Sequence, residues 1–186
     1  MNQGRATETT LIRVWDPAVR LFHWSLVLTF AVAWLSANAW EDLHTWAGFA
    51  AAGLIALRLV WGVIGTPYAR FRQFVRPPKE TVVYLKAIAA AKEARCVGHN
   101  PAGGAMIIAL ILAMSATALT GWLLTTDAFW GVRWMQKLHE RSADGIMLLV
   151  VVHVAGVVLA SFRHRENLIR GMISGMKRGP GPGDVA

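Results

Sequence analysis

Cysteine is almost absent from this chain of 186 residues, which contains only Cys96. A single cysteine excludes an intrachain disulfide and also a Cys-x-x-Cys-His motif, the signature of covalently attached haem. Charge is sparse too: 16% of the residues are charged and 55% are hydrophobic, with a positive mean hydropathy. No internal repeat or low-complexity stretch is evident. These features argue against an ordinary soluble protein and favour a single membrane domain over residues 1–186.

Four apolar segments are long enough to cross a hydrocarbon core about 30 Å thick. We expect membrane-spanning helices at about 19–39, 43–65, 102–126 and 136–162. The first segment is longer than the core of a signal peptide and no small-residue cleavage site follows it, so we expect it to be retained. The sequence therefore predicts an all-α, integral membrane four-helix bundle.

The net charge of +8 is distributed as in a membrane protein rather than as in a nucleic-acid-binding protein, so we expect no nucleic-acid partner. Fifteen of the 19 Lys and Arg side chains lie in the N-terminal arm, the loop between the second and third spans, or the C-terminal tail. The two opposite loops contain three: Arg133, Lys137 and Arg141. By the positive-inside rule both termini lie in the cytoplasm.

The segments outside the spans carry weaker signals. After Pro77-Pro78, apolar residues at helical spacing predict a surface helix at about 79–95. Asn100 followed by Pro101 predicts a helix cap. Tryptophans at both ends of the spans, including Trp15 at the cytoplasmic end, are typical of the aromatic belts at membrane interfaces. The glycine- and proline-rich tail after Arg178 is expected to be flexible.

Four of the six histidines lie in or at the mouths of the spans: His23, His44, His139 and His153. Ionisable side chains in a bilayer are costly and mark functional sites. One such histidine is equally well explained as a helix-to-helix hydrogen bond, but four with matching positions are not.

The spacing of the histidines predicts two metal sites. His139 and His153 are 14 residues apart, which places them about 40° apart around the fourth span and about 21 Å apart along it. Depth pairs His23 with His153 and His44 with His139. Two imidazoles for each metal suit a low-spin, bis-histidine haem that only changes its redox state. We therefore expect two stacked, non-covalent haems.

Three further residues are candidates for cofactor binding. Gly48 and Gly156 follow His44 and His153 on the same helix faces, where a porphyrin needs a close approach, although ordinary helix packing explains either glycine alone. Arg58 shares the face of His44 about 21 Å deeper, so that it could bind a haem propionate. Snorkelling to the cytoplasmic interface is the alternative for Arg58.

These residues resemble the bacterial cytochrome b561 family, which includes the b-type cytochrome subunits of membrane-bound nickel–iron hydrogenases. The formate dehydrogenase gamma subunits are similar. The likeness covers nearly the whole chain, including the four histidine positions. The segments that carry it are Arg13-Val-Trp-Asp-Pro-Ala-Val-Arg-Leu-Phe-His-Trp, Leu43-His-Thr-Trp-Ala-Gly, Arg58-Leu-Val-Trp-Gly, Tyr68-Ala-Arg-Phe, Gly98-His-Asn-Pro and Arg165-Glu-Asn-Leu-Ile-Arg-Gly-Met.

The resemblance implies a diheme cytochrome b in the bacterial inner membrane that exchanges electrons between a quinone and a partner redox protein. In relatives the quinone lies beside a loop with an Asn and a Gly before the third span, which corresponds to 99–103 here and makes Asn100 a quinone-binding candidate. This chain is shorter than the hydrogenase and dehydrogenase subunits and has a minimal first periplasmic turn. A periplasmic cytochrome c is therefore at least as suitable a partner as a large redox enzyme. A homodimer stays open.

Three functions compete. The first, which we favour, is an electron-transfer subunit. The second is a stand-alone superoxide:ubiquinone oxidoreductase, for which Arg133, Lys137 and Arg141 would attract the anion. The third is a non-haem role, such as a metal transporter that uses the same histidines.

Overall fold

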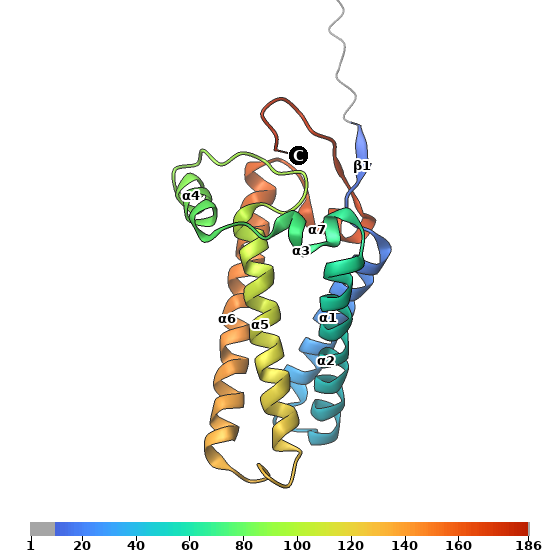
Figure 1. The fold of residues 1–186 in the computed structure, drawn as a ribbon, viewed down its shortest axis with the longest axis vertical. Helices are drawn as coiled ribbons and strands as arrows, with labels where there is room; N and C mark the ends of the chain where they lie inside the picture. Colours follow the sequence, from blue (N-terminus) through green and yellow to red (C-terminus); the bar gives the residue numbers. More distant parts are fainter. Residues whose placement is uncertain (1–9, 186) are drawn as a thin grey trace, which may run out of the picture.

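The computed structural model describes residues 10–185. In this range the chain is mostly helical, with one small two-stranded sheet (Figure 1). In chain order the elements are β1 (Leu11–Arg13), α1 (Pro17–Ser36), α2 (Glu41–Ile64), the 3-10 helix η1 (Pro67–Ala69), α3 (Phe71–Phe74), α4 (Pro78–Ala89), α5 (Pro101–Leu124), α6 (Arg133–Arg163), α7 (Leu168–Ser174) and β2 (Met176–Arg178).

Four of these helices, α1, α2, α5 and α6, are long and apolar enough to cross a membrane. Each overlaps one predicted span but starts one to three residues earlier, because a helix begins at its capping residue rather than at its first apolar residue. At α1, the Asp16 carboxylate accepts a hydrogen bond from the Val19 amide at 2.9 Å, and Pro17 occupies the first turn. At α5, Asn100 Oδ1 accepts from the Gly103 amide at 2.7 Å, which confirms the predicted cap.

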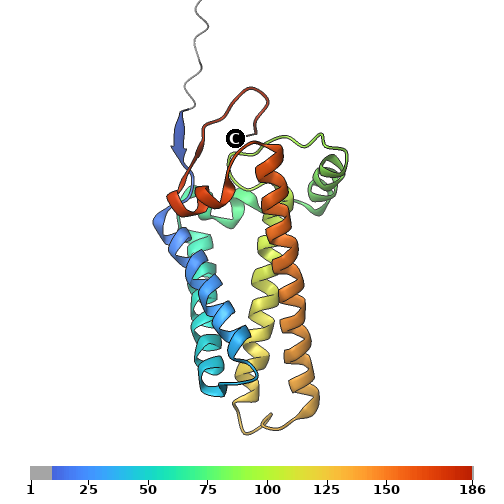
Figure 2. The ribbon, with the colours of Figure 1, turned by 180° about the vertical axis from the view of Figure 1, so that it is seen from behind.

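The four spanning helices form two hairpins. α1 packs against α2, α5 packs against α6, and the hairpins meet mainly through α2 and α5 (Figures 1 and 2). Neither α1 nor α2 packs extensively against α6. α6, which carries His139 and His153, is therefore linked to the α1–α2 hairpin mainly through α5.

One end of the bundle, here called the terminal end, carries β1, α3, α4, α7 and β2 together with the C-terminus (Figure 1). The opposite end, here called the turn end, carries the two hairpin turns. β1 and β2 pair antiparallel, with Leu11 opposite Arg178, an element that the all-α expectation did not include. The surface helix α4 ends at Ala89, six residues before the predicted boundary at 95, because Ala91 adopts φ +55° and turns the chain away.

The C-terminal tail is not the free segment that its composition suggested. The Gly179 amide donates to the Thr10 carbonyl at 2.8 Å, and the Val185 amide donates to the Arg95 carbonyl at 2.8 Å. Glycine and proline alone indicate flexibility, but backbone hydrogen bonds to distant segments hold this tail on the terminal end.

A buried ionic cluster joins the tail to the loop between α4 and α5. We call Arg95, Glu166, Lys177 and Asp184 the cap cluster. Arg95 is 5% exposed and binds Glu166 through two nitrogens at 2.9 and 3.1 Å, while its third nitrogen binds Asp184. Lys177 lies 3.6 Å from Glu166 and donates to the Val97 carbonyl at 2.8 Å. Burial alone would raise the pKa of Glu166, but hydrogen bonds from Arg95 and the charge of Lys177 hold it below its ordinary value.

We expect Arg95→Leu to destabilise the terminal end by about 3 kcal/mol, because it leaves Glu166 and Asp184 without their shared cation in a buried setting. The measurement is thermal unfolding of the purified protein in detergent, with Lys86→Gln, an exposed charge on α4, as the control. In the unaltered protein the pKa values of both carboxyls are lowered. The cluster's stabilisation is therefore present at neutral pH and lost as the pH falls below about 4 through the lowered folded-state values. An Arg95→Leu protein as stable as the Lys86→Gln control would contradict this role.

The tryptophans only partly follow the predicted belts. At the turn end, Trp40, Trp46 and Trp130 are 64%, 71% and 71% exposed. Such exposure fits side chains that contact lipid at a membrane interface. Trp15, predicted as an anchor at the opposite interface, is instead 7% exposed in the small core of the terminal end, where it contacts His99. Its indole contributes to packing of that core rather than to an aromatic belt.

Candidate functional site

The structure brings His44 of α2 and His139 of α6 together at the turn end. Their ring centres are 6.0 Å apart and their planes are nearly perpendicular, at 88°. This separation leaves room between the rings for one metal ion with a bond of about 2 Å to each imidazole. Both residues were expected as one ligand pair.

Hydrogen bonds fix the tautomers of both rings. His44 Nδ1 lies 2.8 Å from the Ala33 carbonyl on α1, and His139 Nδ1 lies 3.1 Å from the Thr117 carbonyl on α5. A carbonyl oxygen only accepts, so in each ring Nδ1 carries the proton and donates it. This leaves the Nε2 lone pair of each neutral imidazole free. Metal-binding histidines are oriented in this way by a second hydrogen bond.

Two residues on α5 that the sequence reasoning missed shape this pair. Thr120 Oγ1 lies 3.1 Å from His139 Nδ1, beside the Thr117 carbonyl. At Gly121 an added Cβ would come within 3.0 Å of His139 Cε1, so the absence of a side chain there lets the imidazole lie against α5. The available signal was the group of polar and small residues, Thr117, Thr120 and Gly121, within an otherwise apolar span.

His23 of α1 and His153 of α6, the second predicted pair, both lie towards the terminal end, on helices that do not pack extensively on each other. His23 Nδ1 is shielded from solvent and has no hydrogen-bond partner, and the ring lies edge-on to Trp24 at 5.0 Å. The structure thus brings His44 and His139 together, and the pairing of His23 with His153 stays a prediction.

The paired imidazoles at the turn end fit a metal-containing group. Cβ atoms built at Gly48 and Gly156 would meet nothing within 4 Å, so open space lies beside both predicted contact positions. The described residues hold no group of three or more His, Cys, Asp or Glu side chains placed to bind a metal ion together. Paired imidazoles beside open space match the axial ligands of a haem.

Arg58 of α2 is 5% exposed, which rules out the snorkelling alternative. One guanidinium nitrogen, Nη1, is buried without a hydrogen-bond partner. The guanidinium carbon lies 5.0 Å from the ring centre of Phe71 and about 6 Å from those of Phe22 and Phe74. A buried cation with an unsatisfied donor is suited to bind an anionic group such as a carboxylate.

His99 and Asn100 lie between α4 and α5, near this arginine. The His99 ring is 4.5 Å from Trp15 and 4.7 Å from Phe74, and its Nδ1 is shielded without a partner. Burial, with a further contribution from the Arg58 charge, lowers the pKa of His99 to about 3, so the ring is neutral at physiological pH. The Asn100 side-chain oxygen is committed to the helix cap, and its amide nitrogen faces the Tyr84 hydroxyl.

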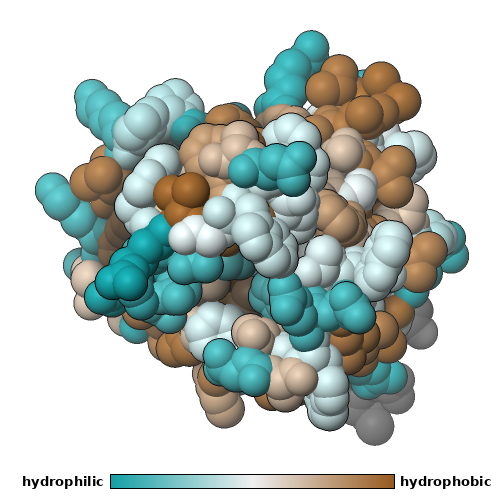
Figure 3. All heavy atoms as spheres, turned by 90° about the horizontal axis from the view of Figure 1, so that it is seen from below, coloured by the Kyte–Doolittle hydropathy of each residue, from teal (hydrophilic) through white to brown (hydrophobic). Residues whose placement is uncertain are grey.

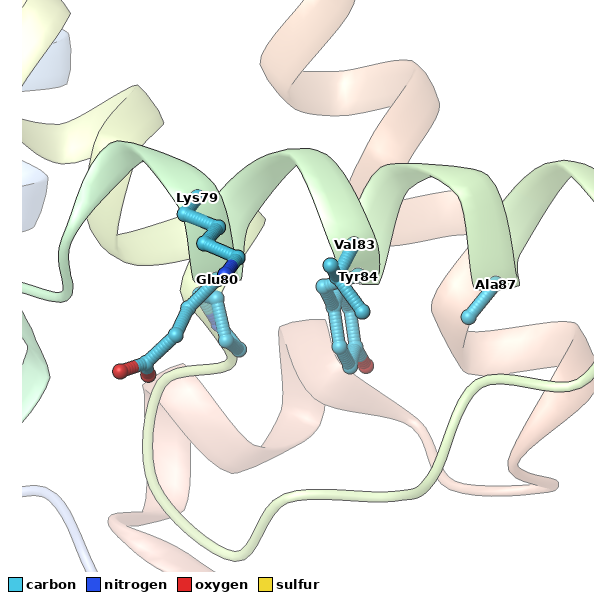
Figure 4. A pocket seen from close by; sticks show the side chains of 6 residues that line it. Lys79, Glu80, Val83, Tyr84 and Ala87 are labelled. Atoms are coloured by element: carbon cyan, nitrogen blue, oxygen red, sulfur yellow. The ribbon is translucent and has the colours of Figure 1, made fainter.

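Two surface hollows lie near these elements. One, of about 280 Å³, lies between α4 and the start of α5 and is lined by Lys79, Glu80, Val83, Tyr84, Ala87 and Pro101 (Figure 4). The other, of about 600 Å³, is lined by Trp40, Glu41, Asp42 and Leu43, next to His44. The first is almost wholly apolar, and the second is an open hollow on the turn between α1 and α2.

The turn end is a mixed surface, with hydrophilic and hydrophobic side chains interleaved (Figure 3). Of the three basic residues there, Lys137 is paired with Glu140 at 2.7 Å. Glu41, Asp42 and Asp127 are exposed at the same end. The predicted basic patch is therefore largely offset by acidic neighbours.

Comparison with known proteins gives one finding. The model of the family described as prokaryotic cytochrome b561 matches residues 14–175. That range contains all four spanning helices and the four candidate ligand histidines. No curated protein and no solved structure matched the chain.

Proposed function

The chain belongs to the prokaryotic cytochrome b561 family, and from this premise we propose that it is a diheme membrane cytochrome b. It transfers electrons between a quinone pool and a partner redox protein. A b-type haem and a role in membrane electron transfer follow from the family and the four spans. The haem count, the ligands, the quinone and the partner are the proposal.

The turn-end histidine pair carries the proposal. When bound, a haem supplies an iron that gains and loses one electron reversibly. His44 and His139 bind the iron through Nε2, while the Ala33 and Thr117 carbonyls hold the rings in place. Because two imidazoles would hold the iron, a haem bound here would transfer electrons rather than bind a substrate at the metal.

His23 and His153 bind the second haem towards the terminal end. The rise along α6 separates His139 from His153 by about 21 Å. Open space beside Gly48 and Gly156 accommodates the porphyrin edges, and the unsatisfied nitrogen of Arg58 binds a propionate of the second haem. Residues 1–186 then form a single functional domain.

The terminal end faces the cytoplasm in this proposal, because most of the Lys and Arg side chains lie on that side. The chain would then lie in the bacterial inner membrane, with the turn end in the periplasm. A quinone binds near the cytoplasmic site, with the Asn100 amide nitrogen as a donor. The partner at the turn end is a periplasmic cytochrome c or a subunit of a redox enzyme.

An electron-transfer role is favoured over a stand-alone superoxide:ubiquinone oxidoreductase by the charges of the turn end. A small anion is attracted by an uncompensated positive field. Here Lys137 is paired with Glu140, Glu41 and Asp42 line the hollow next to His44, and Asp127 is exposed in the turn between α5 and α6.

The experiment uses the purified holoprotein in liposomes that contain ubiquinol or menaquinol. We expect quinol to reduce the haem, seen as a rise of the b-type α-band, and an added soluble cytochrome c to reoxidise it. Asn100→Asp, which keeps the helix cap but loses the amide donor, should slow the quinol step at least tenfold. Lys86→Gln serves as the matched control. Rapid quinone reduction by the chain with superoxide as the only donor would replace this proposal by the enzymatic one.

A further inference from the structure

Arg58 is a deeply buried cation whose charge is not matched by a neighbouring carboxylate. No ion pair to it occurs in the described part of the chain. The acidic group whose charge reaches it is Asp16, and that carboxylate is already bound by the Val19 amide and the Thr66 hydroxyl. The faces of three phenylalanines lie near the guanidinium. Aromatic faces attract a cation but leave its charge in place.

This charge lies beside the terminal-end pair. Phe22, whose ring faces the guanidinium at 6.0 Å, directly precedes His23 in the chain. Arg58 follows His44 by 14 residues on α2 and His153 follows His139 by 14 residues on α6, so Arg58 and His153 lie at a similar depth, about 21 Å from the turn-end pair. In a poorly solvated interior such a charge acts over a longer range than it would at the surface.

The turn-end pair has no comparable neighbour. The acidic residue that acts on His139 is Glu140, which is 57% exposed and paired with Lys137. Water and the ion pair screen both of these charges. α5, which holds His139 in place, contains no charged residue at all.

We infer that Arg58 makes the terminal-end site the more easily reduced of the two, so that its midpoint potential lies above that of the turn-end site. A nearby positive charge stabilises the form that holds the extra electron. If a haem propionate pairs with Arg58, the guanidinium offsets the negative charge of the propionate. The midpoint potential of the terminal-end site is then still raised. This inference rests on the proposed binding of two haems.

The test is an optical redox titration of the purified holoprotein. His44→Ala and His153→Ala proteins, each expected to keep one site, assign the two components. We expect the terminal-end component to have the higher midpoint potential. Arg58→Gln should lower that component alone by at least a tenfold change in its one-electron equilibrium constant, about 59 mV. Arg58→Lys retains the charge and should restore most of the difference.

Asp16→Asn is a second variant whose expected effect on the potential has the opposite sign. It removes the negative charge that partly offsets Arg58, while it keeps an N-cap side chain. It should raise the terminal-end potential, and Lys137→Gln, at the exposed surface, should leave both components unchanged. A terminal-end component of lower potential than the other, or unmoved by both Arg58→Gln and Asp16→Asn, overturns the inference. A protein that binds only one haem refutes the proposed function instead, so the two failures are distinguishable.

Discussion

His153→Ala is expected to remove about half of the bound haem and to leave the other half spectroscopically intact. The substitution deletes one axial ligand of the terminal-end site, and a bis-histidine haem held by His23 alone loses the bond that fixes it between helices that do not pack on each other. The turn-end pair lies about 21 Å away along α6 and keeps both of its ligands. Haem counting and redox titration of the purified protein measure the outcome.

The matched control for this substitution is Val152→Ala, which shortens an exposed neighbour on the same helix and touches neither site. It should keep the full haem content. Loss of both haems in His153→Ala, while the protein remains folded by circular dichroism, would show that the four histidines are not paired by depth. Retention of both would show that His153 is not a ligand.

His44→Ala is expected to have the reciprocal effect, with a larger consequence for function. The turn-end haem is lost because His139 then faces open space instead of a second imidazole. The terminal-end haem stays and is still reduced by quinol, since the quinone acts from the terminal end. Exchange with a soluble cytochrome c at the turn end should fall at least a hundredfold, because the remaining haem lies too far from that surface.

A haem-free control completes this series. His44→Ala combined with His153→Ala should bind no haem yet insert into the membrane, because the spans are specified by apolar length rather than by the cofactor. If His44→Ala exchanged electrons with cytochrome c as fast as the unaltered protein, the turn-end site could not be the route to the outer face.

The sequence predicted those features that depend on local pattern. Apolar length predicted the four spans, and the Asn100-Pro101 pair predicted a helix cap that the structure confirms. The proximity of His44 and His139 could be predicted because the position of a residue along a helix gives its depth in the membrane and the helix face on which it lies. The family match supports the suspected family over residues 14–175.

Features that depend on contacts between distant segments were not predictable. Arg95 and its partner Asp184 are 89 residues apart, and β1 and β2 come from opposite ends of the chain. Nothing local marks the tail as ordered or Trp15 as buried, because each property arises from packing at the terminal end. Thr117 was also missed, since its backbone carbonyl, rather than its side chain, orients His139.

The most direct measurement is the ratio of non-covalent haem b to polypeptide in the fully reconstituted protein, determined from the extracted pigment against amino-acid analysis. Two imidazole pairs at separate depths predict about two porphyrins per chain, both low-spin and six-coordinate. A ratio of one or less, or a high-spin signal from a vacant axial position, would contradict the assignment of all four histidines as ligands.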